Sequence, residues 1–234
     1  MFYAIIGFIF GFSIPYMARR FAKFMPATLA YAIYRIFTPN KSVSKQKKLS
    51  NTKYLKLRNR YFMRSLGWAI VASAILFLNY LATTPNETPW ISFFILLLLT
   101  LMEIDNRIMY LPDILTSPLL ISGFAYSVFA GFLLGDTLDA STANSALGAI
   151  FGYTIPVIAS LLLIKKHPNN LGGGDIKVLA GIGAWLGLTN IPVVILLSCP
   201  IFAMSCYINK QKQGAFGPSI VISPLIILFL QQYK

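Results

Sequence analysis

The chain has 234 residues, of which 56% are hydrophobic and only 12% charged, and it carries a net charge of +13. Because soluble domains carry about a quarter charged residues, this composition argues against a soluble enzyme, a disordered chain and a secreted disulfide scaffold. At about 20 residues per crossing, it predicts an all-α, polytopic membrane protein with roughly eight transmembrane helices.

The first predicted transmembrane helix covers residues 1–17 and is followed directly by two arginines. A cleaved signal peptide has its charges in front of the apolar stretch, so we expect this segment to stay in the membrane. Residues 18–65 are expected to form a basic cytoplasmic loop, with thirteen Lys and Arg between Arg19 and Arg64 and no acidic residue before Glu87. Such a block is expected to bind anionic lipid headgroups, and we do not expect nucleic acid as a partner.

Seven further apolar runs make up a membrane domain of residues 66–234, near 66–82, 90–108, 114–134, 146–164, 176–188, 192–208 and 219–230. Placing the N-terminus outside and alternating the sides gives external loops at 83–89, 135–145 and 189–190. None of these loops contains Lys or Arg. Membrane proteins carry their basic loops in the cytoplasm, so the pattern supports this orientation.

Four carboxylates lie at the cytoplasmic ends of predicted spans: Glu103, Asp105, Asp113 and Asp175. Ionisable groups in membrane spans are costly unless they are paired or hydrated, so each is a functional candidate. Counting along the spans places Asp105 and Asp175 each about five residues, or ~7 Å, below the cytoplasmic surface. Two carboxylates from different spans are therefore expected at similar depth on the same side.

Such a pair suits an aspartyl protease. One carboxylate is ionised and takes a proton from water, while the other is protonated and hydrogen-bonds the scissile carbonyl, because two close carboxylates share one proton. This chemistry requires neither a metal nor a covalent nucleophile. Gly172, Gly173 and Gly174 can adopt positive φ and admit a substrate backbone beside Asp175. The alternative for this run is a flexible hinge with an acidic helix cap.

Two neighbouring residues have simpler interpretations. Glu103 can pair with Arg107, which lies four residues later on the same predicted helix. Lys177 lies two residues after Asp175. It could act on that carboxylate through its charge or extend toward the membrane surface, and the sequence leaves both alternatives open.

Three motifs, spread from about residue 100 to 220, resemble those of the type IV prepilin peptidases, a family of intramembrane aspartyl proteases. Gly-Gly-Gly-Asp at 172–175, followed by Ile and Lys, is similar to the family's Gly-x-Gly-Asp signature. Asp105, followed by Pro-Asp at 112–113, resembles its first aspartate motif. Gly-Ala-Phe-Gly-Pro at 214–218 resembles its Pro-Phe-Gly-Pro element, with Ala215 in place of proline.

The resemblance implies a peptidase of the bacterial cytoplasmic membrane whose active site faces the cytoplasm. Its substrates would be type IV prepilins or the pseudopilins of type II secretion, from which it removes a short basic leader by cutting after a glycine. It implies Asp105 and Asp175 as the catalytic pair. The supporting active-site residues that it implies are Gly172, Gly173, Gly174, Lys177, Pro112, Asp113, Gly217 and Pro218.

Many members of the family also methylate the new N-terminal amine with S-adenosylmethionine, whereas proteolysis needs no cofactor. The longer members carry two Cys-x-x-Cys pairs that can hold zinc in the first loop, and residues 18–65 contain no cysteine. The family's Arg-Tyr-Pro-x-x-Glu element is reduced to its first two residues at Arg60 and Tyr61. We therefore expect no metal, and the sequence leaves methylation open.

Two functions of other classes remain as alternatives. A small transporter would use Asp105 and Asp175 as proton or cation sites, but such proteins commonly show paired halves with broken helices, and no such repeat is evident. A non-catalytic pilus assembly factor would keep the fold and tolerate loss of either aspartate.

Overall fold

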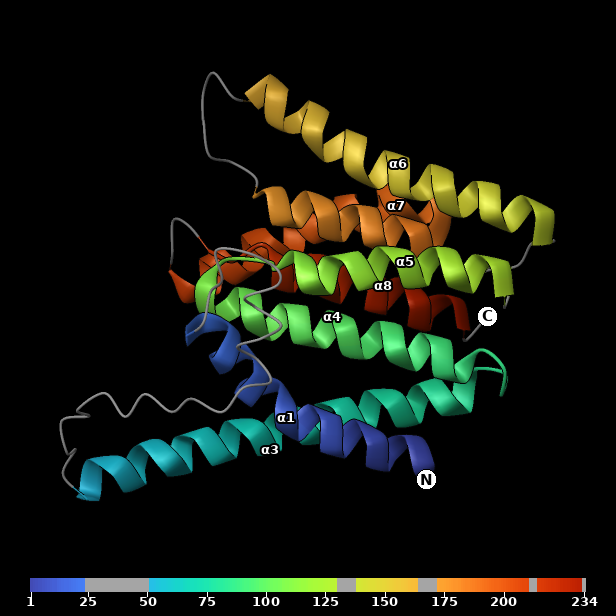
Figure 1. The fold of residues 1–234 in the computed structure, drawn as a ribbon. Coiled ribbons are helices and arrows are strands. Elements are labelled where there is room, and N and C mark those ends of the chain that lie inside the picture. Colours follow the sequence, from blue (N-terminus) through green and yellow to red (C-terminus); the bar gives the residue numbers. More distant parts are fainter. Residues whose placement is uncertain (24–50, 130–137, 164–171, 211–213, 233–234) are drawn as a thin grey trace. The chain divides into compact units, whose positions relative to one another are not determined.

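The computed structural model describes residues 1–23, 51–129, 138–163, 172–210 and 214–232. These residues contain helices and no strand, which confirms the predicted all-α class. The helices are α1 (Phe2–Lys23), α3 (Asn51–Ala82), α4 (Thr88–Ile108), α5 (Asp113–Phe129), α6 (Leu138–Leu163), α7 (Gly173–Asn209) and α8 (Gly217–Gln232) (Figure 1). The chain forms two compact units, Met1–Leu78 and Asn79–Lys234.

Within the described residues, five helices are long and apolar enough to cross a membrane: α1, α3, α4, α6 and α7. Helices α5 and α8 are apolar but shorter. Helix α7 contains two of the predicted spans, because its backbone is not helical at Gly187. The roughly eight expected spans therefore correspond to seven helices of the described residues, one of which is broken. The predicted loop at 18–65 is too long, because residues 18–23 belong to α1 and residues 51–65 belong to α3. Residues 24–50 lie outside the described residues.

The break in α7 is held by side chains of neighbouring helices. Gly187 has φ 75° and ψ 178°, a conformation that strongly favours glycine. The N–H group of Leu188 donates to Oδ1 of Asn144 on α6 at 2.9 Å. Near the end of α8, Nε2 of Gln231 donates to Oδ1 of Asn190 at 3.0 Å.

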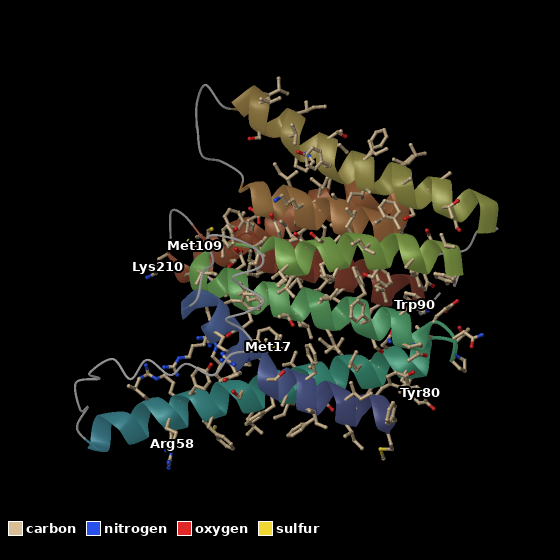
Figure 2. The ribbon with its side chains drawn as sticks, in the orientation of Figure 1. Met17, Arg58, Tyr80, Trp90, Met109 and Lys210 are labelled. Carbon is tan, nitrogen blue, oxygen red and sulfur yellow. The ribbon has the colours of Figure 1, made fainter. Side chains whose placement is uncertain are left out.

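The break turns α7 back toward the end of the unit from which it starts (Figure 1). At its beginning, the backbone of Gly174 lies against Leu111, just after α4. Lys210, just after the end of α7, lies at the same end of the view as Met109, whereas Trp90 at the start of α4 lies at the opposite end (Figure 2). Both ends of α7 therefore lie at the end of α4 that carries Met109, which we call the Met109 end.

Glycines allow α6 to pack closely on the first half of α7. Any Cβ atom on Gly148 would collide with the carbonyl of Gly183, and one on Gly183 would collide with the carbonyl of Gly148. One turn along α6, Gly152 is in similarly close contact with the backbone of Leu179. Small residues at such contacts let helix backbones approach in a membrane, where van der Waals packing replaces the hydrophobic effect.

An aromatic cluster joins α4, α5 and the first half of α7. The Trp185 ring stacks on Phe94 at 4.7 Å and on Tyr126 at 5.2 Å between ring centroids. Its Nε1 donates to the backbone carbonyl of Leu119 at 2.9 Å, so the polar atom of this buried ring is satisfied. These contacts fix the three helices that carry or flank the two aspartates.

The first unit is a packed pair of helices, α1 and α3. Gly7 and Gly11 of α1 lie directly against the backbone of α3 near Ala72 and Trp68. The hydroxyl of Tyr61 donates to the backbone carbonyl of Pro15.

The predicted external loop at 135–145 is wrong for its second part, because α6 already begins at Leu138. Its polar side chains bond to other helices. The hydroxyl of Ser141 donates to the carbonyl of Ser127 at 2.9 Å, and that of Ser145 donates to the carbonyl of Ala184 at 2.7 Å. These polar side chains therefore make contacts between helices, whereas the sequence predicted that they face solvent.

We predict that Gly148→Ala lowers the stability of the unit Asn79–Lys234 by about 1–3 kcal/mol, because the added methyl group forces α6 and α7 apart. Gly67→Ala is the matched control, since a Cβ atom there meets nothing within 4 Å. Thermal unfolding of both variants in one detergent measures the difference. Equal melting temperatures for Gly148→Ala and the wild type would contradict this account of the α6–α7 contact.

Candidate active site

Asp105 lies in the last turn of α4 and is only 4% exposed. Its Oδ2 atom accepts a hydrogen bond of 2.8 Å from the backbone N–H of Gly217, the first residue of α8. An unpaired N–H at a helix N-terminus favours a negative charge, so this contact stabilises the ionised carboxylate.

Only glycine fits at position 217. A Cβ atom there would lie 2.5 Å from Oδ2 and 2.8 Å from Cβ of Asp105. Pro218 follows in the first turn of α8, where a missing N–H removes no helical hydrogen bond. The Gly-Pro pair therefore lets the start of α8 lie against Asp105.

Asp175 lies in the first turn of α7 and is partly buried. Its Oδ2 atom accepts a hydrogen bond of 3.2 Å from the backbone N–H of Gly172. The structure thus bears out the acidic helix cap that the sequence left as an alternative for this run. That contact engages one carboxyl oxygen, so capping and a chemical role are compatible.

The glycines at 172–174 could adopt positive φ, but none of them does so in the structure. Gly172 has φ −70° and ψ 140°, and α7 begins at Gly173. The only glycine with positive φ among the described residues is Gly187. The glycines instead allow a close approach, because a Cβ atom on Gly174 would lie 2.8 Å from Cβ and 3.2 Å from the carbonyl oxygen of Leu111.

The contact between Gly174 and Leu111 brings the end of α4 beside the start of α7. Asp105 and Asp175, predicted at similar depth, both lie at the Met109 end. Pro112 lies between Leu111 and the first residue of α5. The two carboxyl groups come from helices that are far apart in the sequence.

Lys177 forms an ion pair that the sequence did not predict. Its Nζ atom lies 2.6 Å from Oδ1 of Asp113, the first residue of α5. Each of these two side chains is about half exposed, at 49% and 48%. The ion pair links the segment after α4 to the first turns of α7.

The predicted pairing of Glu103 with Arg107 is confirmed. Nε of Arg107 donates to Oε1 of Glu103 at 2.7 Å within α4. The Glu103 carboxylate is fully buried, so its charge is compensated by the neighbouring guanidinium.

Sequence reasoning missed the Gly217 amide and the anchoring of α8 beside it. The rings of Phe216 and Phe202 meet edge to face, with 5.2 Å between their centroids, and this contact joins the start of α8 to the returning half of α7. The Gly-Pro pair in the 214–218 motif was the signal, since it marks a helix start that can approach another group closely.

Comparison with known proteins agrees with the family resemblance of the sequence motifs. Residues 92–208 match the model of the type IV leader peptidase family. The chain is 30% identical over 185 residues to the prepilin leader peptidase/N-methyltransferase of Vibrio cholerae serotype O1, covering 74% of this chain and 67% of that protein. It is 31% identical over 134 residues to the protein of the same name from Neisseria gonorrhoeae, covering 56% and 44%. No solved structure matches the chain.

A third relative, from Aeromonas salmonicida and of the same name, is 36% identical over 145 residues, covering 57% of this chain and 46% of that protein. The chain therefore spans less than half of the Neisseria and Aeromonas relatives.

We predict that Asp105→Asn keeps the stability of the wild type, because an amide oxygen can still accept from the Gly217 N–H. Asp105→Ala leaves that buried donor unpaired and should cost about 1–3 kcal/mol. Thermal unfolding of the two variants side by side measures the difference. If Asp105→Ala unfolds at the temperature of Asp105→Asn, the hydrogen bond does not hold α8 in place.

Proposed function

The chain belongs to the type IV leader peptidase family, and from that membership we propose that it is a membrane aspartyl endopeptidase. Its substrates are type IV prepilins or pseudopilins, from which it removes the basic leader by cutting after a glycine. The observation that carries this proposal is the pair Asp105 and Asp175, which come from α4 and α7 to the same end of one unit.

In the proposed reaction, one aspartate is ionised and the other protonated, because two close carboxylates share a proton. The ionised carboxylate takes a proton from a water molecule, whose oxygen attacks the scissile carbonyl carbon. The protonated carboxyl group donates to the carbonyl oxygen as charge develops there. The tetrahedral intermediate then collapses, the C–N bond breaks, and a proton passes to the leaving amine.

The surroundings of each aspartate suit these steps. The Gly217 amide holds one oxygen of Asp105, and the Gly172 amide holds one oxygen of Asp175. Each carboxyl group therefore keeps its second oxygen for water or substrate. Such fixed donors orient the reacting groups before the substrate arrives.

We place the site at the cytoplasmic face of the bacterial cytoplasmic membrane. Basic residues mark the cytoplasmic ends of membrane helices, and Arg107, Lys177 and Lys210 all lie on the helix ends that form the Met109 end. The basic residues between Arg19 and Arg64 would bind anionic lipid headgroups.

Methylation is the second activity in the relatives' names, and S-adenosylmethionine would be its methyl donor. The first loop, in which the sequence departs from the longer members, lies mostly outside the described residues. We therefore propose only the peptidase activity. The mass of the mature pilin decides whether a methyl group is also added.

We predict that a prepilin co-expressed with this chain is found by mass spectrometry without its leader. Asp105→Asn and Asp175→Asn should each reduce processing to below about one thousandth, because the two carboxyl groups act as a unit. Methylation would add about 14 Da to the mature pilin.

Glu87→Gln is the matched control, since it removes one carboxylate at the opposite end of α4 and should leave cleavage unchanged. Each variant must be confirmed in the membrane, and the host must lack its own prepilin peptidase and methylase. Wild-type processing that survives in either aspartate variant would contradict the two-aspartate reaction. A transporter or an assembly factor would leave the precursor uncut in every sample, including with the pilin encoded nearest this gene.

A further inference from the structure

The segment between α4 and α5 touches the start of α7 at two points. Leu111 lies against the backbone of Gly174, and Asp113 forms the 2.6 Å ion pair with Lys177. We propose that the Asp113–Lys177 pair is a positioning device that sets the separation of Asp105 and Asp175. This inference rests on the proposed function, because it assigns a role in the same site.

The two helices that carry the aspartates need such a device, because their main packing partners are other helices. Among the described residues, α4 packs chiefly on α5 and α8, and α7 packs chiefly on α5, α6 and α8. The Phe94–Trp185 stacking joins α4 to α7 near the Trp90 end of α4. At the Met109 end, the separation of the aspartates therefore depends on connecting elements. The stretch 109–113 is the one that starts at the end of α4 and reaches the first turns of α7.

That stretch can transmit a displacement of Asp113 to Asp105. Helix α4 ends where Met109 adopts a left-handed conformation with φ 49°, and the Met109 N–H donates to the carbonyl of Asp105 at 2.9 Å. Pro112 then restricts the backbone before α5 begins. The connection is short and its dihedral angles are limited, so its two ends do not move independently.

Helix stability alone does not account for Lys177. A positive charge near a helix N-terminus opposes the helix dipole, and Lys177 lies in the second turn of α7. Residues two apart on a helix do not face each other, so Lys177 is directed away from Asp175 and toward Asp113. Lys177 therefore makes a contact between α7 and the first residue of α5.

Because the pair is exposed to water, its effect on the position of the aspartates can be told apart from an effect on folding. Both side chains are about half exposed, and ion pairs in contact with water contribute little to stability. Loss of the pair should therefore leave the protein folded. A small displacement of one catalytic carboxyl group relative to the other, by contrast, strongly reduces turnover.

The first test measures cleavage of a prepilin by purified Asp113→Asn and Lys177→Gln variants in lipid nanodiscs. We expect kcat to fall by about a hundredfold in each, with KM within about threefold of the wild type and with unchanged thermal unfolding. Lys177→Arg should retain most activity. Lys210→Asn is the matched control, since it removes a lysine charge from the same end at an exposed left-handed position that asparagine tolerates.

Coupling within the pair gives a second readout. Because both single variants break the same contact, the double variant Asp113→Asn/Lys177→Gln should be no slower than either single variant. Rates that multiply in the double variant would show two independent roles and would overturn the proposal.

A distance measurement keeps the inference separate from the proposed function. Spin labels at Met109→Cys and Gly173→Cys, in a Cys199→Ser/Cys206→Ser background, report the spacing of the two segments. Met109 is exposed, and a Cβ atom on Gly173 meets nothing within 4 Å. We expect one narrow distance distribution, which Lys177→Gln broadens and Lys210→Asn leaves unchanged.

An unchanged distribution in Lys177→Gln, or wild-type kcat in both single variants, would overturn the positioning role while leaving the peptidase intact. If the wild type cleaves no prepilin, the proposed function fails, and the spin-label distances alone then decide whether the pair sets the spacing.

Discussion

The hydrogen bond from the Gly217 amide to Asp105 is the contact on which the rest of the site depends. A carboxylate that is 4% exposed at the end of an apolar helix must find a partner, because a buried unpaired charge is costly. Here the partner is the N-terminus of α8, which can approach only because residue 217 has no side chain. The bond therefore ties the last turn of α4 to the start of the final helix.

The break in α7 makes this arrangement possible. A continuous helix of 37 residues would be about 55 Å long and would end far from the turn at which it started. The conformation of Gly187 and the amide of Asn144 instead let the second half return to the Met109 end. There the Phe202–Phe216 contact holds the start of α8, so Asp105 and Asp175 share one end of the unit although 70 residues separate them in the sequence.

The sequence predicted the features that follow from membrane physics and helix geometry. Span length and charge placed Asp105 and Asp175 at similar depth, and the spacing of four residues predicted the pair of Glu103 with Arg107. It could not predict the Gly217 bond, because a backbone donor 112 residues away leaves no trace in composition or periodicity. It also missed the partner of Lys177, because Asp113 lies 64 residues away in the sequence. The start of α6 was misassigned because polar side chains that bond neighbouring helices look like those of a loop.

The central claim is that Asp105 and Asp175 belong to one reaction centre. Its most direct test is cross-linking of Asp105→Cys with Asp175→Cys in a Cys199→Ser/Cys206→Ser background, by mild oxidation or a short bifunctional thiol reagent in native membranes. We predict a cross-linked peptide pair by mass spectrometry in the double variant and none in either single variant. Two cysteines that each react with a monofunctional reagent, yet never join to each other, would contradict the account.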